Sequence, residues 1–298
     1  MISRRRFLVQ AAAAAVAAHA ALGEAPTPMI DAHVHVWETN PEFPFAAGAH
    51  PSPANATPET LLGLMRANGV ARTVLIQVIH YKWDNRFLLH TLKKYPGKFQ
   101  GVCRVNPLDP AAPDELSRLT EAGCRGVRLS PAGTAEGDWM RGPLMPPLWR
   151  RCAELKVPMT ILAPVTRMPD LKPLIAANPE LDVVIDHMAD CPVDRPDLLK
   201  LLLDLARYPR VCIKISDMWV VSKMPYPYPD AQAMVGRLRD AFGAQRLMGD
   251  TNWPVSLKQL PYARIVELYR EHMTVFNAEE REQVLYKTVQ RLWPFGVT

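Results

Sequence analysis

The sequence has 298 residues, of which 48% are hydrophobic and 22% are charged. This composition is typical of a large globular core and excludes a disordered or fibrous chain. The formal net charge is +5 at pH 7, and subtracting the three arginines at positions 4–6 leaves only +2 for the rest of the chain. So small a charge argues against a strongly basic surface, and we predict no nucleic-acid partner.

The first residues of the chain predict an export signal. Arg4 and Arg5 precede Phe7 and Leu8, and a run of alanines follows, which is the pattern of a twin-arginine signal. We predict that residues 1–20 are this signal and that the twin-arginine machinery exports the protein to the periplasm. A basic amphipathic helix is the alternative interpretation. The alanine run is too short to span a bilayer, so we expect the mature protein not to be embedded in a membrane.

The rest of the chain, residues 27–298, alternates short apolar runs with longer amphipathic segments, and we interpret it as one domain. Apolar runs bounded by turn residues predict strands, and apolar residues recurring every three to four positions predict helices. Strands are predicted within 28–37, 71–79, 99–105, 124–130, 157–164, 181–187, 210–216 and 245–250. Helices are predicted at 57–69, 84–96, 110–122, 143–155, 169–178, 195–207, 230–242, 260–273 and 278–292.

The order of these elements predicts the fold class. Eight β-then-α units in succession favour an α/β fold in which parallel strands close into a (β/α)₈ TIM barrel. The segment 278–292 adds a further helix at the C-terminus. No glycine-rich dinucleotide-binding motif follows the first strand, which counts against an open doubly wound sheet.

Polar side chains stand at the predicted ends of seven strands, where a TIM barrel carries its chemistry. His33 and His35 end the first strand two residues apart, so both imidazoles project from the same face of that strand. The others are Gln77, His80, Arg104, Asn106, Arg128, Ser130, Asp186, His187, Lys214, Ser216, Asp217, Asp250 and Asn252. Their shared position predicts one barrel mouth lined by polar groups.

Six motifs resemble those of a known family: "IDAHVHVW", "GVRL", "VVIDHMA", "CIKIS", "GDTNWPVS" and "TVQRLWPF". They are similar to the amidohydrolase-related family of the amidohydrolase superfamily, and in particular to its lactonases for sugar lactones and for 2-pyrone-4,6-dicarboxylate. The resemblance extends, in order, over the whole chain after the predicted signal. It implies a TIM-barrel hydrolase.

The resemblance also implies roles for residues in the predicted mouth. His33, His35 and His187 would polarise the scissile carbonyl, directly or by holding one divalent metal ion, most simply zinc, together with an acid after the eighth strand. That acid would act as general base toward water. The family motif leaves Asp250 and Asn252 as its possible positions, and we favour Asp250 because an asparagine cannot take up a proton. Metal-free catalysis stays open, since imidazole and guanidinium groups also stabilise an oxyanion.

Two departures from the family pattern limit the metal content. The fourth strand carries Arg128 and no lysine that could bridge two ions, and Ala163 stands near the place of a histidine in the fifth strand. The remaining candidate ligands, His33, His35, His187 and Asp250, suffice for one ion and are too few for two.

The predicted reaction is hydrolysis of a lactone, or another cyclic ester, of a small carboxylated or sugar-acid substrate. Arg104 and Arg128 would bind an anionic group, because guanidinium pairs with carboxylate in a bidentate manner. Further candidates for substrate contacts are Gln77, Lys214 and Asn252. Two alternatives remain: a metal-dependent non-oxidative decarboxylase of the same family, and a non-catalytic periplasmic barrel that binds an anionic ligand.

Overall fold

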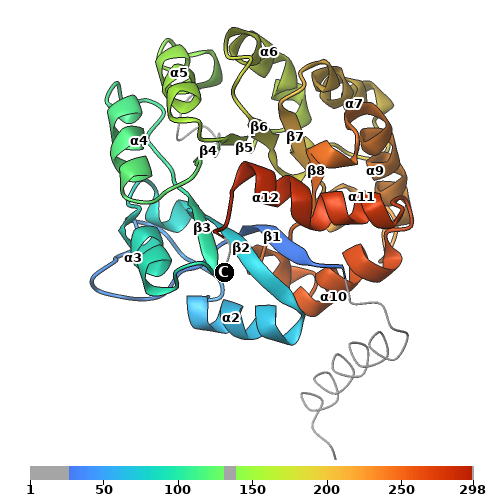
Figure 1. The fold of residues 1–298 in the computed structure, drawn as a ribbon, viewed down its shortest axis with the longest axis horizontal. Coiled ribbons are helices and arrows are strands. Elements are labelled where there is room, and N and C mark those ends of the chain that lie inside the picture. Colours follow the sequence, from blue (N-terminus) through green and yellow to red (C-terminus); the bar gives the residue numbers. More distant parts are fainter. Residues whose placement is uncertain (1–26, 131–138, 297–298) are drawn as a thin grey trace, which may run out of the picture.

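The computed structural model describes residues 27–130 and 139–296. These residues form a barrel of parallel strands surrounded by helices (Figure 1). The export signal predicted at residues 1–20 lies outside the described residues and stays a prediction. Within the described ranges, no helix is both long enough and apolar enough to cross a membrane.

Eight strands follow one another around the barrel in chain order, as predicted. They are β1 Met29–Val34, β2 Val70–Ile76, β3 Phe99–Val102, β4 Val127–Leu129, β5 Met159–Ile161, β6 Val183–Ile185, β7 Val211–Lys214 and β8 Leu247–Met248. Regular parallel pairing joins neighbouring strands in two groups, one from β1 through β3 and the other from β4 through β8. Single parallel bridges join these two groups at both seams, Cys103 with Val127 and Val34 with Trp253. The barrel is therefore closed.

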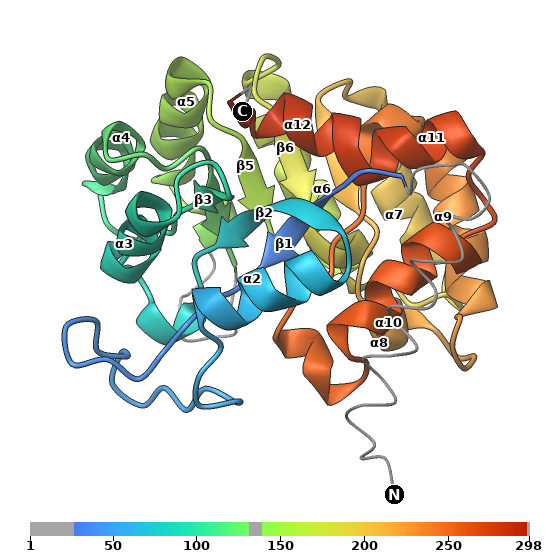
Figure 2. The same cartoon turned by 60° about the horizontal axis from the view of Figure 1, so that its bottom comes forward.

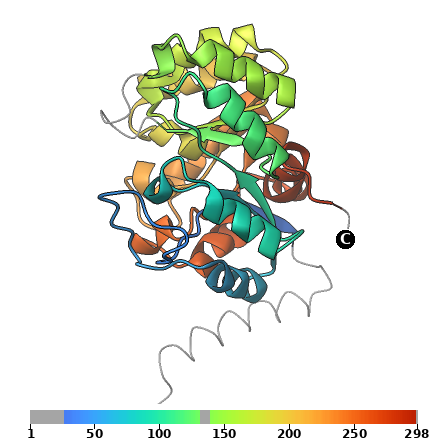
Figure 3. The ribbon, with the colours of Figure 1, turned by 90° about the vertical axis from the view of Figure 1, so that its left-hand side faces the viewer.

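Helices surround the strands and alternate with them (Figures 1 and 3). The main ones are α2 Pro58–Ala67, α3 Arg86–Lys94, α4 Ala112–Glu121, α5 Met145–Leu155, α6 Met168–Ala177, α7 Pro196–Leu203, α9 Pro229–Phe242, α10 Tyr262–Glu267, α11 Ala278–Glu282 and α12 Thr288–Leu292. They lie within the predicted segments or within one residue of them. The segment predicted at 278–292 is α11 and α12 joined by a π-helical turn, Gln283–Lys287. The short helix α8, Met218–Val221, was not predicted, because one turn is too short to show a helical period.

The C-terminal helix closes the end of the barrel at which the strands begin. Arg72, near the start of β2, donates a hydrogen bond to the carbonyl oxygen of Gly296 at 3.2 Å. Trp293 is fully buried and packs with the side chains that fill the barrel. Figure 2 shows α12 lying across this end. The members of this interior cluster are Ile30, Ala32, Val74, Ile76, Val102, Val184, Cys212, Met248, Val289, Leu292, Trp293 and Phe295. At the opposite end of the barrel, where the strands end, lie the polar residues that follow them.

Candidate active site

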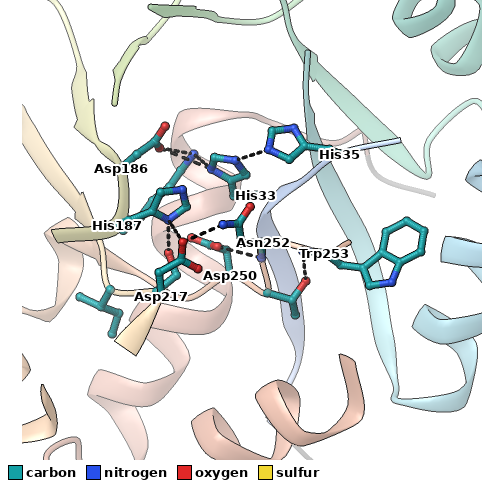
Figure 4. Close-up of polar contacts among 12 residues, drawn as sticks. His33, His35, Asp186, His187, Asp217, Asp250, Asn252 and Trp253 are labelled. Atoms are coloured by element: carbon teal, nitrogen blue, oxygen red, sulfur yellow. Dashed lines mark hydrogen bonds and ion pairs between the residues drawn. The ribbon is translucent and has the colours of Figure 1, made fainter. Parts of the chain in front are cut away.

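Polar side chains from distant parts of the chain meet at the C-terminal ends of the strands (Figure 4). His33 of β1, His187 after β6 and Asp250 after β8 each offer one nitrogen or oxygen atom, and these atoms lie within 4.8 Å of one another. The three residues are only 0%, 4% and 0% exposed, respectively. The barrel thus assembles the predicted mouth in a buried environment, where electrostatic interactions are stronger than in water.

The two histidines of the first strand contact each other. Their Nε2 atoms are 3.1 Å apart, and His35 Nδ1 lies 2.8 Å from the carbonyl oxygen of Ile76. Burial, with the nearby charge of Arg128, lowers the pKa of His35 to about 3. Burial and the charge of Lys214 hold the pKa of His33 well below its ordinary value. Both imidazoles are therefore neutral at neutral pH.

Asp186, directly after β6, connects three basic side chains. Its Oδ1 lies 2.9 Å from Lys214 Nζ and 3.5 Å from His33 Nδ1, and its Oδ2 accepts a hydrogen bond from Arg128 Nε at 3.1 Å. Burial raises the pKa of this carboxyl, but the charges of Lys214 and Arg128 outweigh burial and hold the pKa well below its ordinary value. Asp186 is therefore an ionised carboxylate shared between basic groups.

His187 is oriented by residues that follow β7 and β8. Its Nδ1 lies 2.7 Å from Ser216 Oγ and 3.8 Å from Asp217 Oδ2, and that same carboxylate oxygen accepts a hydrogen bond from Asn252 Nδ2 at 2.7 Å. The φ angles of His187, Asp217 and Asn252 are 51°, 55° and 47°. Side chains other than glycine rarely adopt this left-handed region, and such residues cluster at functional sites. Here they turn three polar groups toward one another.

Asp250 is fully buried and keeps one oxygen available. Its Oδ1 accepts a hydrogen bond from the backbone N–H of Asn252 at 3.1 Å, whereas Oδ2 has no hydrogen-bond partner among the described residues. Burial raises the pKa of Asp250 well above its ordinary value; Lys214 opposes this, while Asp31 and Asp217 raise the pKa further. Such a carboxyl group can exchange a proton at Oδ2.

The structure separates the two candidates for the acid after the eighth strand. Asp250 belongs to the cluster with His33 and His187. The amide group of Asn252 is engaged with Asp217 instead. This arrangement places Asp250, and not Asn252, beside the two imidazoles.

A cavity of about 280 Å³ is lined by Arg128, whose Nε donates a hydrogen bond to Asp186, the residue before His187. Both arginines predicted to bind an anion, Arg104 after β3 and Arg128 in β4, line it, and the guanidinium carbon of Arg104 lies 5.3 Å from the ring centre of Trp83. The cavity is also lined by Ile79, Ser130, Leu162, Ala163, Pro164 and Asp190. Positive charge beside an apolar wall suits a small ring that carries a carboxylate.

Gln77 and Lys214, which were also predicted to contact substrate, bond to other groups of the protein. Gln77 donates a hydrogen bond to the carbonyl oxygen of Asp84, and Lys214 is fully buried against Asp186 and His33. His35 contacts His33 and lies outside the three-residue cluster that could hold a metal ion.

Three residues of the network received no role from the sequence: Asp186, Ser216 and Asp217. All three stand at strand ends. Asp186 precedes His187, and Ser216 and Asp217 follow Lys214 by two and three positions. Their position after a strand could have indicated a role in the site. However, that position shows only at which end of the barrel a side chain lies. Their roles follow from contacts across the barrel, between β6, β7 and β8.

The closed barrel, with polar residues gathered at the C-terminal ends of its strands, has the architecture of a TIM-barrel enzyme. The chain belongs to the amidohydrolase family, Amidohydro_2, whose profile matches residues 30–295.

Three similar proteins carry lactone-hydrolase names. A 2-pyrone-4,6-dicarboxylate hydrolase of Comamonas testosteroni is 28% identical to this chain, and the match covers 90% of this chain and 91% of the relative. An L-fucono-1,5-lactonase of Burkholderia ambifaria is also 28% identical, and the match covers 76% of this chain and 80% of the relative. A solved structure described as a 2-pyrone-4,6-dicarboxylic acid hydrolase of Pseudomonas putida has a TM-score of 0.79 and 26% identity, and covers 91% of this chain and 99% of its own.

The cluster of His33, His187 and Asp250 is also of a kind that binds metal ions. A solved amidohydrolase of Burkholderia multivorans, with a TM-score of 0.73, 22% identity, and coverage of 90% of this chain and 100% of its own, holds bound zinc. In this chain, His33, His187 and Asp250 bring three atoms of ligand type within 4.8 Å of one another, and Asp250 Oδ2 has no hydrogen-bond partner among the described residues. The ammonium group of Lys214, 3.1 Å from His33 Nδ1, does not fit an ion held by that imidazole.

Proposed function

We propose that the protein hydrolyses a lactone, or another cyclic ester, of a small carboxylated or sugar-acid substrate. The observation that carries this proposal is the available Oδ2 of Asp250 beside the imidazoles of His33 and His187. A buried carboxylate next to two imidazoles can take a proton from water while the carbonyl is polarised. The lactone-hydrolase names of the similar proteins support the proposal.

In the proposed reaction, Asp250 takes a proton from a water molecule whose oxygen attacks the lactone carbonyl carbon. The carbonyl oxygen becomes an oxyanion stabilised by His33 and His187, with His35 holding His33 in place. The ring carbon–oxygen bond then breaks, and the leaving oxygen takes the proton from Asp250. The product is a hydroxy acid whose new carboxylate contains the oxygen of the water.

We further propose that the substrate is an anion. Arg104 and Arg128 line the same small cavity. Among the described residues, Arg128 forms an ion pair with Asp186 through Nε alone, which leaves its Nη atoms to bind a carboxylate. The ring of the substrate would lie against the apolar wall formed by Ile79, Leu162 and Pro164.

The test uses protein that lacks residues 1–20 and three probes: D-glucaro-1,4-lactone, D-glucono-1,4-lactone and 2-pyrone-4,6-dicarboxylate. The first two differ only by a carboxylate in place of a hydroxymethyl group. We expect acid release, followed with a pH indicator, from a carboxylated lactone. Folded protein that releases acid from no lactone or ester would contradict the proposal. Carbon dioxide release from an aromatic acid would favour the decarboxylase, and thermal stabilisation without turnover would favour the binding barrel.

The zinc ion predicted from the sequence has its own test. Imidazole and guanidinium groups can stabilise the oxyanion without it, whereas a bound ion would polarise the carbonyl and acidify water. Elemental analysis of purified protein measures the number of zinc ions per chain. A value near zero, with activity unaffected by a chelator, supports metal-free hydrolysis. A value near one, with activity lost in chelator, supports the ion, and a value near two contradicts both.

We also propose export through the twin-arginine pathway, on the basis of the sequence of residues 1–20. The double substitution Arg4→Lys and Arg5→Lys is expected to keep the precursor in the cytoplasm. Cell fractionation and immunoblotting measure its distribution, with Arg6→Lys as the matched control outside the pair. Export of the double variant at the normal rate would show that the assignment is wrong.

A further inference from the structure

A continuous line of polar contacts crosses the barrel from β7 to β2. Lys214 Nζ lies 3.1 Å from His33 Nδ1, His33 Nε2 lies 3.1 Å from His35 Nε2, and His35 Nδ1 lies 2.8 Å from the carbonyl oxygen of Ile76. We propose that Lys214 is a positioning residue that, together with the Ile76 carbonyl at the other end of this line, fixes the proton of His33 on Nε2.

The Ile76 end of the line assigns the proton first. A carbonyl oxygen only accepts hydrogen bonds, so His35 Nδ1 must carry the hydrogen. A neutral imidazole has one N–H group, and His35 Nε2 is then an acceptor. The only donor that matches it across the 3.1 Å contact is an N–H group on His33 Nε2.

The Lys214 end gives the same assignment independently. A lysine ammonium group has three donors and no acceptor, so His33 Nδ1, 3.1 Å away, must offer its lone pair. Lys214 is held in this place by Asp186 Oδ1 at 2.9 Å, and Asp186 is itself held by Arg128. All three residues of this arrangement, Lys214, Asp186 and His33, are 0% exposed, so bulk water offers them no competing hydrogen bonds.

This assignment changes what His33 offers to a ligand. Its Nε2 carries an N–H group, which in this structure points to His35 Nε2, and its Nδ1 lone pair faces Lys214. A metal ion instead needs the lone pair of a neutral imidazole nitrogen. In this state the three-residue cluster offers lone pairs only from His187 and Asp250, fewer than the three protein ligands of a catalytic zinc site. The role of the donor in lactone opening rests on the proposed function; the proton position itself does not.

The test is ¹⁵N NMR of histidine-labelled, metal-free protein at neutral pH, with His33→Gln used to assign the resonances. The ¹⁵N shifts distinguish a protonated from an unprotonated ring nitrogen. We expect His33 to carry its proton on Nε2 and to leave Nδ1 unprotonated. A wild-type spectrum with Nδ1 protonated would overturn the proposal, whether or not any lactone is hydrolysed.

Variants at position 214 test whether Lys214 is what fixes the proton of His33 on Nε2. In Lys214→Met, Asp186 Oδ1 at 3.5 Å is the charged acceptor that remains beside His33 Nδ1, so that nitrogen is expected to gain a proton. Lys214→Arg keeps a donor and should retain the wild-type pattern, as should the matched exposed control, Lys258→Met. An unchanged His33 spectrum in folded Lys214→Met would overturn the role of Lys214. If that variant does not fold, the wild-type spectrum still decides where the proton lies.

Zinc titration in the same spectra tests the consequence for metal binding. The His33 resonances of the wild-type protein are expected to stay unshifted after one equivalent of zinc. A shift of His33 and His187 together at one equivalent would contradict the inferred donor state.

Discussion

Asp250→Asn is expected to lower kcat by about 10²- to 10⁴-fold, the usual contribution of a general base, with little change in KM. The substitution keeps the size of the side chain and the acceptor for the N–H of Asn252, but it removes the group that takes the proton from water. Steady-state hydrolysis of a carboxylated lactone measures the effect. Because burial raises the pKa of Asp250, the acid limb of the wild-type pH profile should lie above the ordinary carboxyl range, and activity should rise with pH through it.

The neighbouring position supplies a matched control for this prediction. Asn252→Asp places a second carboxylate beside Asp217, whose Oδ2 now accepts a hydrogen bond from Asn252 at 2.7 Å. The double variant Asp250→Asn with Asn252→Asp should therefore stay inactive. Recovery of activity in the double variant would show that position 252, and not 250, holds the catalytic acid.

Arg104→Gln is expected to raise KM for a carboxylated lactone by about 10- to 100-fold, since a hydrogen bond to a charged group contributes about 1.5–3 kcal/mol. Arg104 is 1% exposed and lines the cavity, and a glutamine leaves a donor there without the positive charge. The value of kcat should change much less, because Arg104 is not part of the cluster formed by His33, His187 and Asp250.

D-Glucono-1,4-lactone, which lacks the carboxylate of D-glucaro-1,4-lactone, is the control for the expected rise in KM. If D-glucono-1,4-lactone is turned over, Arg104→Gln should leave its kcat/KM nearly unchanged. Arg118→Gln, on the exposed face of α4, should affect neither lactone. An equal loss of kcat/KM for both lactones would mean that Arg104 supports the structure of the mouth and does not bind a carboxylate.

The sequence predicted the fold well because one pattern repeats throughout the chain. The apolar runs around Ile30 and Val184 fill the barrel, and amphipathic segments such as 110–122 cover its outside. A helix was predicted at 278–292, but its contact with the strand starts was not. That contact depends on Trp293 and Gly296 meeting residues far away in the sequence.

The candidate site was predictable in its members but not in their contacts. The spacing of His33 and His35 predicted that they share one face, and their Nε2 atoms meet at 3.1 Å. Lys214 was predicted to contact substrate because it ends a strand, yet its ammonium group is buried against Asp186. Sequence position indicates which end of the barrel a side chain belongs to. It does not indicate how deep a flexible side chain lies or which charge it meets across the barrel.

Hydrolysis in H₂¹⁸O tests the central claim most directly, because it follows the oxygen that Asp250 is proposed to activate. Single-turnover reaction of a lactone substrate, followed by mass spectrometry of the product fragments, locates the label. Water attack on the carbonyl carbon predicts one ¹⁸O atom in the new carboxylate and none in the new hydroxyl group. Label in the hydroxyl group, or a product that has lost carbon dioxide, would contradict the account.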